Sequence, residues 1–387
     1  MSEMKSAVGA GTDRSGDDLC VGNSMREFKI WADVLSYGKQ ILKNAGIAEA
    51  DLDAWYLFEQ IFGISRAQYF LCARENIAGS TAQKMAAQEQ PGNSLESKNA
   101  LHRVELWLKK KLQAYGNALE KRAARIPLQQ IIGQQEFMGL TFFVNEHVLI
   151  PRQDTETLVE LVLQEQKDKD ISILDMCTGS GCIAVSLKKL GEYACVTGAD
   201  ISEEALKVAK RNAEEILENN DVNNDAVSSR TEQIQNCINL TNNQNKQNNS
   251  AECRVSETSK VSQAGVTFRY SDMFSTFPET ERFNVIVSNP PYIPSAVIEE
   301  LEPEVRDHEP RGALDGTADG LYFYRILAEE CAKHLTPGGH VYFEIGYDQG
   351  AAVKELLDIH GFKDTRVIQD LTGKDRVVYG AWQTAGV

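Results

Sequence analysis

Residues 171–187 read Ile-Ser-Ile-Leu-Asp-Met-Cys-Thr-Gly-Ser-Gly-Cys-Ile-Ala-Val-Ser-Leu. An apolar run that ends in an acid, a short turn of small residues and a second apolar segment predict a strand, a tight turn and a helix. Glycine in the turn lets the backbone approach a ligand, and the first N–H groups of the helix can bind an anion. Because Cys177 occupies the first glycine position of the dinucleotide pattern Gly-x-Gly-x-x-Gly, a carboxylate-bearing ligand is favoured over a pyrophosphate.

The segment that follows extends this unit into an alternating fold. Residues 194–200 form a second apolar run that ends in Asp200, and an acid at this place can accept both hydroxyls of a ribose. From Asp170 onward strands and helices alternate, which predicts an α/β fold with a parallel, doubly wound sheet. The expected strands are 171–176, 194–200, 265–270, 283–288, 339–345, 362–369 and 376–382. The expected helices are 180–190, 202–217, 321–334 and 348–360.

A second motif follows the fourth expected strand, where residues 289–292 read Asn-Pro-Pro-Tyr. Neither proline can donate a backbone hydrogen bond, and each keeps the residue before it extended, so the carbonyls of Asn289 and Pro290 are held rigidly. An amide oxygen, fixed carbonyls and the Tyr292 ring then converge beyond the end of a strand. Such a cluster suits a planar group that bears an NH2, and a carboxamide or the exocyclic amine of a base would fit. A proline-rich turn without a ligand is the alternative.

The remaining segments differ in composition. Residues 26–125 have apolar positions at helical spacing and predict a helical domain. Residues 1–25 are polar, and residues 218–262 are rich in Asn and Gln, which predicts a disordered extension and a disordered insertion. Three consecutive lysines at 109–111 lie on the last expected helix of the helical domain. They indicate either a solvated helix face or a basic surface for an acidic partner.

Composition also limits the class of function. A formal charge of −16 argues against an extensive nucleic-acid surface. No apolar run reaches the length of a membrane span and the first residues do not resemble a signal peptide, so we expect a cytoplasmic location. The eight cysteines include no Cys-x-x-Cys pair, which predicts reduced thiols, and the six histidines lack the spacing of zinc ligands.

These motifs together resemble those of the class I S-adenosylmethionine-dependent methyltransferases. More narrowly, the chain is similar to the protein glutamine-N(5) methyltransferases that modify peptide chain release factors. Matching stretches beyond the two motifs above lie at 125–133, 137–142, 148–156 and 309–325, and the similarity extends over 26–217 and 263–385. The departures from the family pattern are Gln153 in place of a proline, Cys177 in place of a glycine and Met273 in place of an aromatic residue.

The resemblance implies a seven-stranded, doubly wound class I methyltransferase sheet with an N-terminal helical-bundle domain joined to it by a β-hairpin. On this basis we expect an extension at 1–25, a helical substrate-recognition domain at 26–125, a hairpin linker at 126–150 and a methyltransferase domain at 151–387, which would contain the insertion.

The resemblance also implies the cofactor, S-adenosylmethionine, and the roles of particular residues. The expected cofactor-binding residues are Cys177, Thr178, Gly179, Ser180, Gly181, Asp200, Asp272, Met273 and Asn289. The expected substrate-binding residues are Asn289, Pro290, Pro291 and Tyr292. Of these, Asn289, Pro290 and Tyr292 are the expected catalytic residues, and no metal is expected.

The implied reaction is methylation of the glutamine in the Gly-Gly-Gln motif of release factors, with these proteins as partners and with no stable binding to nucleic acid or membrane. Hydrogen bonds from the substrate NH2 to the Asn289 side chain and the Pro290 carbonyl would make the amide nitrogen a better nucleophile, while Tyr292 stacks on the amide. Three alternatives remain at this stage. They are an N6-adenine nucleic-acid methyltransferase, a glutamine methyltransferase acting on a ribosomal protein and a cofactor-binding protein without activity.

Overall fold

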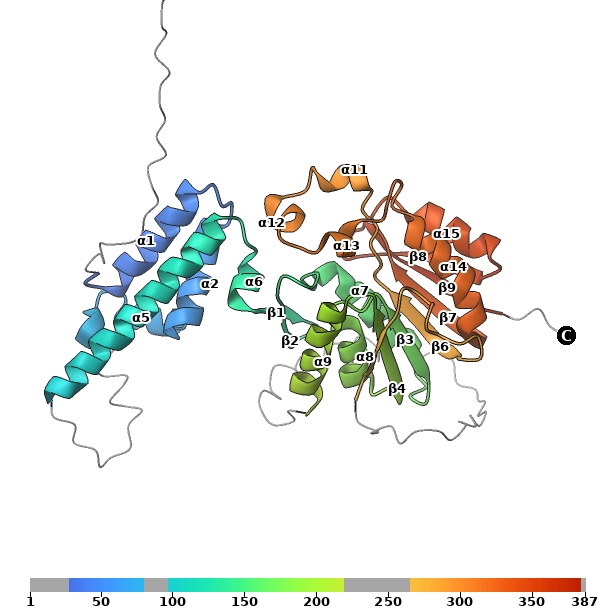
Figure 1. The fold of residues 1–387 in the computed structure, drawn as a ribbon, viewed down its shortest axis with the longest axis horizontal. Coiled ribbons are helices and arrows are strands. Elements are labelled where there is room, and N and C mark those ends of the chain that lie inside the picture. Colours follow the sequence, from blue (N-terminus) through green and yellow to red (C-terminus); the bar gives the residue numbers. More distant parts are fainter. Residues whose placement is uncertain (1–27, 80–96, 219–264, 384–387) are drawn as a thin grey trace, which may run out of the picture. The chain divides into compact units, whose positions relative to one another are not determined.

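The computed structural model describes residues 28–79, 97–218 and 265–383. The chain forms two compact units, residues 1–123 and 124–387 (Figure 1). The expected extension at 1–25 lies outside the described residues, as does the expected insertion from residue 219 onward.

The first unit is a group of helices around an aromatic core. Its helices are α1 (Trp31–Asn44), α2 (Ala50–Phe62), α3 (Arg66–Cys72) and α5 (Ser97–Ala123). Phe58 is fully buried, and its ring lies 5.7 Å from that of Trp31 and 4.9 Å from that of Phe62. Contacts between rings at these distances stabilise a core beyond the burial of apolar area alone. The apolar spacing of residues 26–125 therefore predicted a helical unit correctly.

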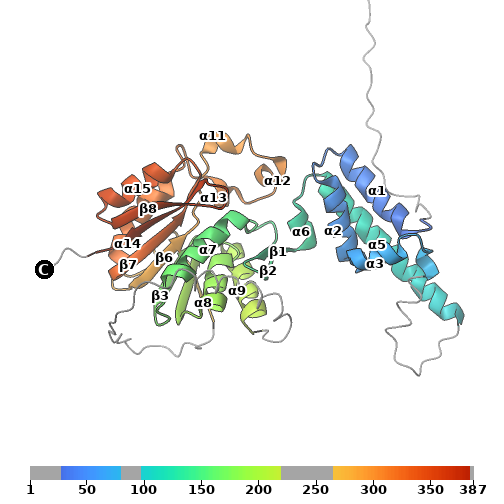
Figure 2. The same ribbon diagram turned by 180° about the vertical axis from the view of Figure 1, so that it is seen from behind.

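The second unit is built on a seven-stranded sheet in the order β5-β4-β3-β6-β7-β9-β8 (Figures 1 and 2). The strands are β3 (Ser172–Met176), β4 (Cys195–Asp200), β5 (Thr267–Tyr270), β6 (Phe283–Ser288), β7 (Leu335–Glu344), β8 (Lys363–Gln369) and β9 (Asp375–Ala381). From β3 the chain proceeds outward through β4 to β5 and then returns to place β6 on the other side of β3. The order reverses between β3 and β6, so the predicted doubly wound α/β fold is confirmed.

One strand departs from the expected parallel arrangement. β9 pairs antiparallel with both β7 and β8, while β3 to β7 pair in parallel. A turn at residues 370–374 joins β8 directly to β9, and its two ends are held by a backbone hydrogen bond of 2.8 Å from Asp370 to Lys374. Because a parallel connection needs a long crossover, a turn this short must reverse the chain. The expectation of a parallel sheet was therefore wrong for β9.

Helices cover both faces of this sheet (Figures 1 and 2). One layer contains α7 (Gln153–Glu165), α8 (Cys182–Gly191) and α9 (Glu203–Glu218), and the other contains α14 (Tyr322–His334) and α15 (Gly350–Ile359). On β6, Val285 and Val287 pack with the first layer and Ile286 packs with the second, as the alternation of side chains along a strand requires. None of the helices in the described ranges is both long enough and apolar enough to span a bilayer.

A hairpin at the start of the second unit packs on the layer of helices that contains α7, α8 and α9. It follows the short helix α6 (Leu128–Ile132) and consists of β1 (Gln134–Phe137) and β2 (Leu140–Phe143). The rings of Phe137 and Phe142 are buried in the same apolar cluster as α7 and α8. Asn212 of α9 accepts the Phe143 N–H at 2.7 Å and donates to the Phe143 carbonyl at 3.0 Å. The hairpin is thus packed as part of the second unit.

Candidate active site

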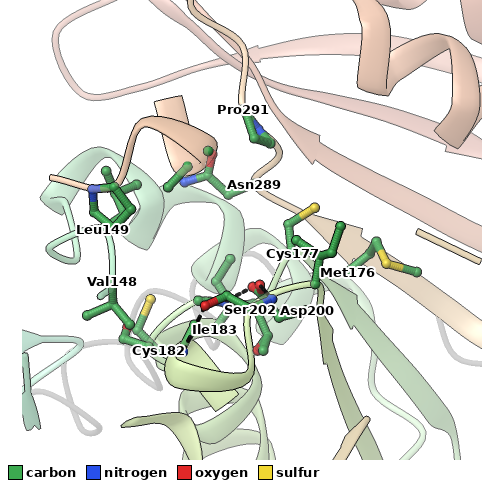
Figure 3. Close-up of a pocket in the computed structure, with 18 of the residues that line it drawn as sticks. Val148, Leu149, Met176, Cys177, Cys182, Ile183, Asp200, Ser202, Asn289 and Pro291 are labelled. Carbon is green, nitrogen blue, oxygen red and sulfur yellow. Dashed lines mark hydrogen bonds between the residues drawn. The ribbon is translucent and has the colours of Figure 1, made fainter. Parts of the chain in front are cut away.

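A cavity of about 550 Å³ lies among the residues that follow β3, β4, β5 and β6 (Figure 3). This is the point at which the strand order reverses, where doubly wound sheets bind their ligands. The predicted site residues that line it are Cys177, Thr178, Gly179, Ser180, Asp200, Asp272, Met273, Asn289 and Pro291. Gly181, Pro290 and Tyr292 are not among the described residues that form its wall.

Gly181 has a steric role in the local fold. It has a φ of 80° and directly precedes α8. A Cβ added to it would lie 3.0 Å from the Cβ and 3.2 Å from the Cα of Ala209 on α9. Glycine is therefore required both by the left-handed backbone and by the close packing of α8 against α9.

Asp175 supports the glycine turn, although the sequence-based site set omitted it. Its carboxylate is fully buried, and its Oδ2 accepts hydrogen bonds from the Thr178 hydroxyl at 2.5 Å and the Ala184 N–H at 3.1 Å. Burial raises the pKa of Asp175 to about 7, against the lowering effect of these two hydrogen bonds. The acid at the end of the first apolar run was the signal, and its partners became visible only in the folded turn.

Asp200 ends β4 and connects the two predicted parts of the cofactor site. Its Oδ2 accepts the Gly179 N–H at 2.8 Å, and its Oδ1 accepts the Ser202 N–H at 2.9 Å. Burial raises the pKa of Asp200, while these backbone donors oppose the rise. The carboxylate faces the cavity beside the turn (Figure 3), so it can accept further hydrogen bonds from ligand hydroxyls.

Cys177 and Met273 are two of the departures from the family pattern, and they meet in the cavity wall. Cys177 has a φ of 64° and Met273 a φ of 46°, and their sulfur atoms are 4.0 Å apart. Burial raises the pKa of the Cys177 thiol well above its ordinary value, and the charge of Asp200 adds to this effect. Cys177 is therefore a neutral packing residue rather than a reactive thiolate.

The backbone at Cys177 provides a stability prediction. We expect Cys177→Val to lower the free energy of unfolding by about 1–3 kcal/mol, because a β-branched residue disfavours a positive φ. Cys177→Gly should be much less harmful, because glycine adopts this conformation without steric cost. Denaturant titration of both variants measures the difference. Equal losses would show that the buried thiol, and not the backbone conformation, sets the stability at this position.

The Asn-Pro-Pro-Tyr loop leaves β6 with its side chains divided between two environments. Asn289 and Pro291 line the cavity (Figure 3), and the Asn289 Nδ2 donates to the Thr155 Oγ1 at 3.3 Å. The Tyr292 ring packs against the apolar cluster that includes α14 and α15, and the Tyr292 carbonyl accepts a hydrogen bond of 2.9 Å from Gln349. Burial raises the pKa of Tyr292, and the charge of Glu344 raises it further. The stacking role of Tyr292 stays a prediction.

Other parts of the cavity wall were not assigned from the sequence. They come from the start of α7 and from the segment before and into α14, and include Arg152, Thr155, Ala313, Tyr322 and Phe323. The Arg152 guanidinium donates to Glu309 at 2.6 Å, and the Glu309 side chain is only 1% exposed. This pair ties the loop between β6 and α14, which contains α11 (Ser295–Ile298), α12 (Pro303–Arg306) and α13 (Arg311–Leu314), to the start of α7. The sequence distinguishes the stretch 148–156 by its family likeness, but its position in the cavity depends on packing.

The sheet order, the glycine turn after β3, the acid after β4 and the Asn-Pro-Pro-Tyr loop after β6 define a class I S-adenosylmethionine-dependent methyltransferase. Comparison with known proteins agrees with this class. Residues 33–88 match the family model of the PrmC N-terminal domain, and residues 194–343 match that of the Eco57I restriction-modification methylase.

Curated relatives narrow the class further. The chain is 38% identical over 269 residues to the release factor glutamine methyltransferase of Geobacter sulfurreducens, covering 70% of this chain and 78% of the relative. It is 33% identical over 343 residues to the protein of the same name from Caulobacter vibrioides, covering 88% of this chain and 93% of the relative. The chain belongs to the release factor glutamine methyltransferase family.

Proposed function

We propose that this protein transfers a methyl group from S-adenosylmethionine to the side-chain amide nitrogen of the glutamine in the Gly-Gly-Gln motif of peptide chain release factors. One arrangement supports this activity more than any other. Asn289, which can accept a hydrogen bond from an NH2 group, lines the same cavity as Asp200 and the glycine turn. In this proposal a nucleoside-binding region and an amide-binding region are therefore next to each other. The reaction is expected in the cytoplasm, where peptide chain termination takes place.

The residues present fit the cofactor. A Cβ added to Gly179 would have no described atom within 4 Å, so the turn leaves its backbone open to a ligand. The Asp200 carboxylate is placed for ribose hydroxyls, and the apolar side chains of Ile201 and Met273 suit a purine. The N-terminal end of α8 would favour the ligand's carboxylate. When bound, S-adenosylmethionine supplies a methyl group on a positively charged sulfur.

The Asn-Pro-Pro-Tyr loop acts on the glutamine amide, whose nitrogen is a weak nucleophile because its lone pair is shared with the carbonyl. In our proposal the Asn289 Oδ1 and the Pro290 carbonyl accept the two amide hydrogens. These oriented dipoles hold the nitrogen toward the methyl donor and stabilise the positive charge that develops on it during transfer. Pro291 and Tyr292 complete the contact surface. No base is needed for the transfer itself, since the proton can leave the nitrogen afterwards.

We further propose that the helical unit recognises the body of the release factor. The family model that matches residues 33–88 lies within this unit. Apolar side chains remain on its surface, where Phe70 and Leu71 of α3 are 84% and 82% exposed. Exposed neighbouring apolar side chains are typical of protein interaction surfaces. We expect no stable binding to nucleic acid, because the net charge of −16 opposes it.

Peptide mass spectrometry tests the proposal directly. The protein is incubated with S-adenosylmethionine and purified release factor, and the digested factor should carry one added methyl group on the Gly-Gly-Gln peptide. A release factor with glutamate in place of that glutamine is the control and should remain unmodified.

Parallel incubations separate the alternatives. Adenine-containing DNA is one substrate, because the Asn-Pro-Pro-Tyr loop suits any planar NH2 group and lies within the match to the restriction-modification methylase model. A ribosomal-protein extract is the other. Methylation of adenine, or of a ribosomal glutamine in preference to the release factor, would contradict the proposal.

A further inference from the structure

The mechanism above leaves out a buried carboxyl group next to Asn289. Glu344 is the last residue of β7 and is only 1% exposed. In the parallel pairing of β6 with β7, Ser288 lies opposite Phe343, so Asn289 and Glu344 are the next neighbours along the two strands. One oxygen of this carboxyl group, Oε2, is buried without a hydrogen-bond partner among the residues that the structure describes.

Glu344 and Thr155 together surround the nitrogen end of the Asn289 amide. The Asn289 Nδ2 donates to the Thr155 Oγ1 at 3.3 Å, and Thr155 is only 2% exposed. The Thr155 hydroxyl and the Asn289 side chain are close enough to the Glu344 carboxyl group to lower its pKa as hydrogen-bond donors. An ionised carboxylate accepts hydrogen bonds and cannot donate them. Because the carboxylate can only accept and the Thr155 Oγ1 accepts from the Nδ2, both neighbours favour the NH2 end of the Asn289 amide.

The orientation of this amide decides whether the site can bind its substrate. The two ends of a carboxamide have nearly the same shape, and a rotation by half a turn exchanges the acceptor for a donor. With the Nδ2 held by Thr155 and Glu344, the Oδ1 is left to accept from an NH2 group in the cavity. In the opposite orientation, two NH2 groups would face one another.

We propose that Glu344 is a positioning residue, which acts through Thr155 and the NH2 group of Asn289 to keep the Asn289 oxygen directed at the substrate amide. This inference rests on the proposed function, because it assigns a role for the same site. Glu344 does not contact the substrate in this arrangement. Its effect is to orient the Asn289 oxygen before the substrate binds. A dipole that is already oriented stabilises the transition state without a further cost of reorganisation.

The charges around Glu344 come from several elements. Arg376 of β9 and Asp154 of α7 form an ion pair at 2.9 Å, and their charges act on Glu344 in opposite directions. The charge of Glu344 in turn raises the pKa of Tyr292 in the loop after β6, of Tyr324 on α14 and of Cys182 on α8. Burial is the largest influence and raises the pKa of Glu344 to about 7. The ionised form that acts only as an acceptor is therefore gained as the pH rises through about 7.

Turnover as a function of pH tests the role of Glu344. For the wild-type protein, kcat for release factor methylation should rise with pH through about 7. In Glu344→Gln we expect kcat to be roughly tenfold lower, the size of one hydrogen bond to a charged group, and the rise near pH 7 to disappear. The dissociation constant for S-adenosylmethionine should be unchanged, because Glu344 is not in the cavity wall.

The hydroxyl of Thr155 offers a second test that removes no buried charge. Thr155→Val should also lower kcat, whereas Thr155→Ser should restore it, because serine keeps the hydroxyl that links Asn289 to Glu344. Thr197→Val is the matched control, since Thr197 is a threonine buried within β4. This control should leave kcat unchanged. Unchanged turnover and pH dependence in both Glu344→Gln and Thr155→Val would overturn the inference.

A direct observation of the amide separates this inference from the proposed function. The side-chain NH2 resonances of Asn289 can be identified in NMR spectra by their loss in Asn289→Asp. In the wild-type protein these hydrogens should exchange slowly with water, and in Glu344→Gln they should shift and exchange faster. Such a change without methylation of release factors would keep the positioning role and reject the substrate. Methylation with no change in these resonances would do the opposite.

Discussion

Replacing Asn289 with alanine is expected to lower kcat for release factor methylation by on the order of a hundredfold or more. The variant removes the side-chain oxygen that, in our proposal, accepts a hydrogen bond from the substrate amide as positive charge develops on its nitrogen. That interaction is stronger in the transition state than in the bound substrate, so the loss should appear in kcat more than in KM. Steady-state kinetics with purified release factor measures both constants.

Two further measurements show whether this loss is chemical. The dissociation constant for S-adenosylmethionine should change by much less than kcat, because the glycine turn and Asp200 remain. Asn284→Ala serves as a matched control, since it removes an asparagine side chain from the opposite end of β6, where Asn284 accepts the Ser172 N–H at 2.9 Å. It should reduce stability but leave kcat near the wild-type value. Near-normal methylation by Asn289→Ala would refute the proposed role of this residue.

Replacing Asp200 with alanine is expected to weaken S-adenosylmethionine binding on the order of a hundredfold. Two hydrogen bonds from ribose hydroxyls to a charged carboxylate would be lost, and such bonds are about twice as strong as neutral ones. Asp200→Asn keeps one acceptor oxygen in the same place, so its loss should be nearer to tenfold. Isothermal titration calorimetry with each variant gives the dissociation constants.

The folded state of these variants needs its own measurement, because Asp200 also accepts the backbone N–H groups of Gly179 and Ser202. Thermal unfolding should show a lower midpoint for Asp200→Ala than for Asp200→Asn. Asp319→Asn is the control for loss of a carboxylate, since Asp319 is exposed and forms an ion pair with Arg325 on α14. It should bind the cofactor normally. Equal affinity of Asp200→Ala and the wild-type protein would exclude the assigned ribose contact.

The sequence was sufficient to predict an element wherever the pattern that identifies the element lies within one segment. β6 begins at Phe283 and ends at Ser288, as expected from a run of β-branched residues that is followed by two prolines. The turn residues 177–180 and the acid at Asp200 also line the same cavity, as their places after two neighbouring strands predict. The spacing of apolar residues and the order of the motifs can be read directly from the chain. The carboxyl ends of parallel strands share one edge of a sheet, so motifs that follow neighbouring strands meet there.

The packing partners of individual residues could not be obtained in this way. The sequence did not show that Gly181 is closely packed against α9, or that the Tyr292 ring packs against the apolar cluster of α14 and α15. Thr155 was overlooked as part of the site because its partner Asn289 is on a distant segment. Asp175 was overlooked although its partners Thr178 and Ala184 are close in sequence, because only the folded turn directs their donors at its carboxylate. The antiparallel direction of β9 follows from the short connection at residues 370–374 between β8 and β9.

The order of the elements, the ligand-binding edge and the residue types that meet there can thus be derived from the chain alone, since they follow from periodicity and from a few motifs. The contact of Asn289 with Thr155 spans 134 positions of sequence, and the neighbouring Glu344 comes from a different strand. Such partners are chosen by strand register and by the packing of α7 over the sheet, so the orientation of the amide is a property of the folded molecule.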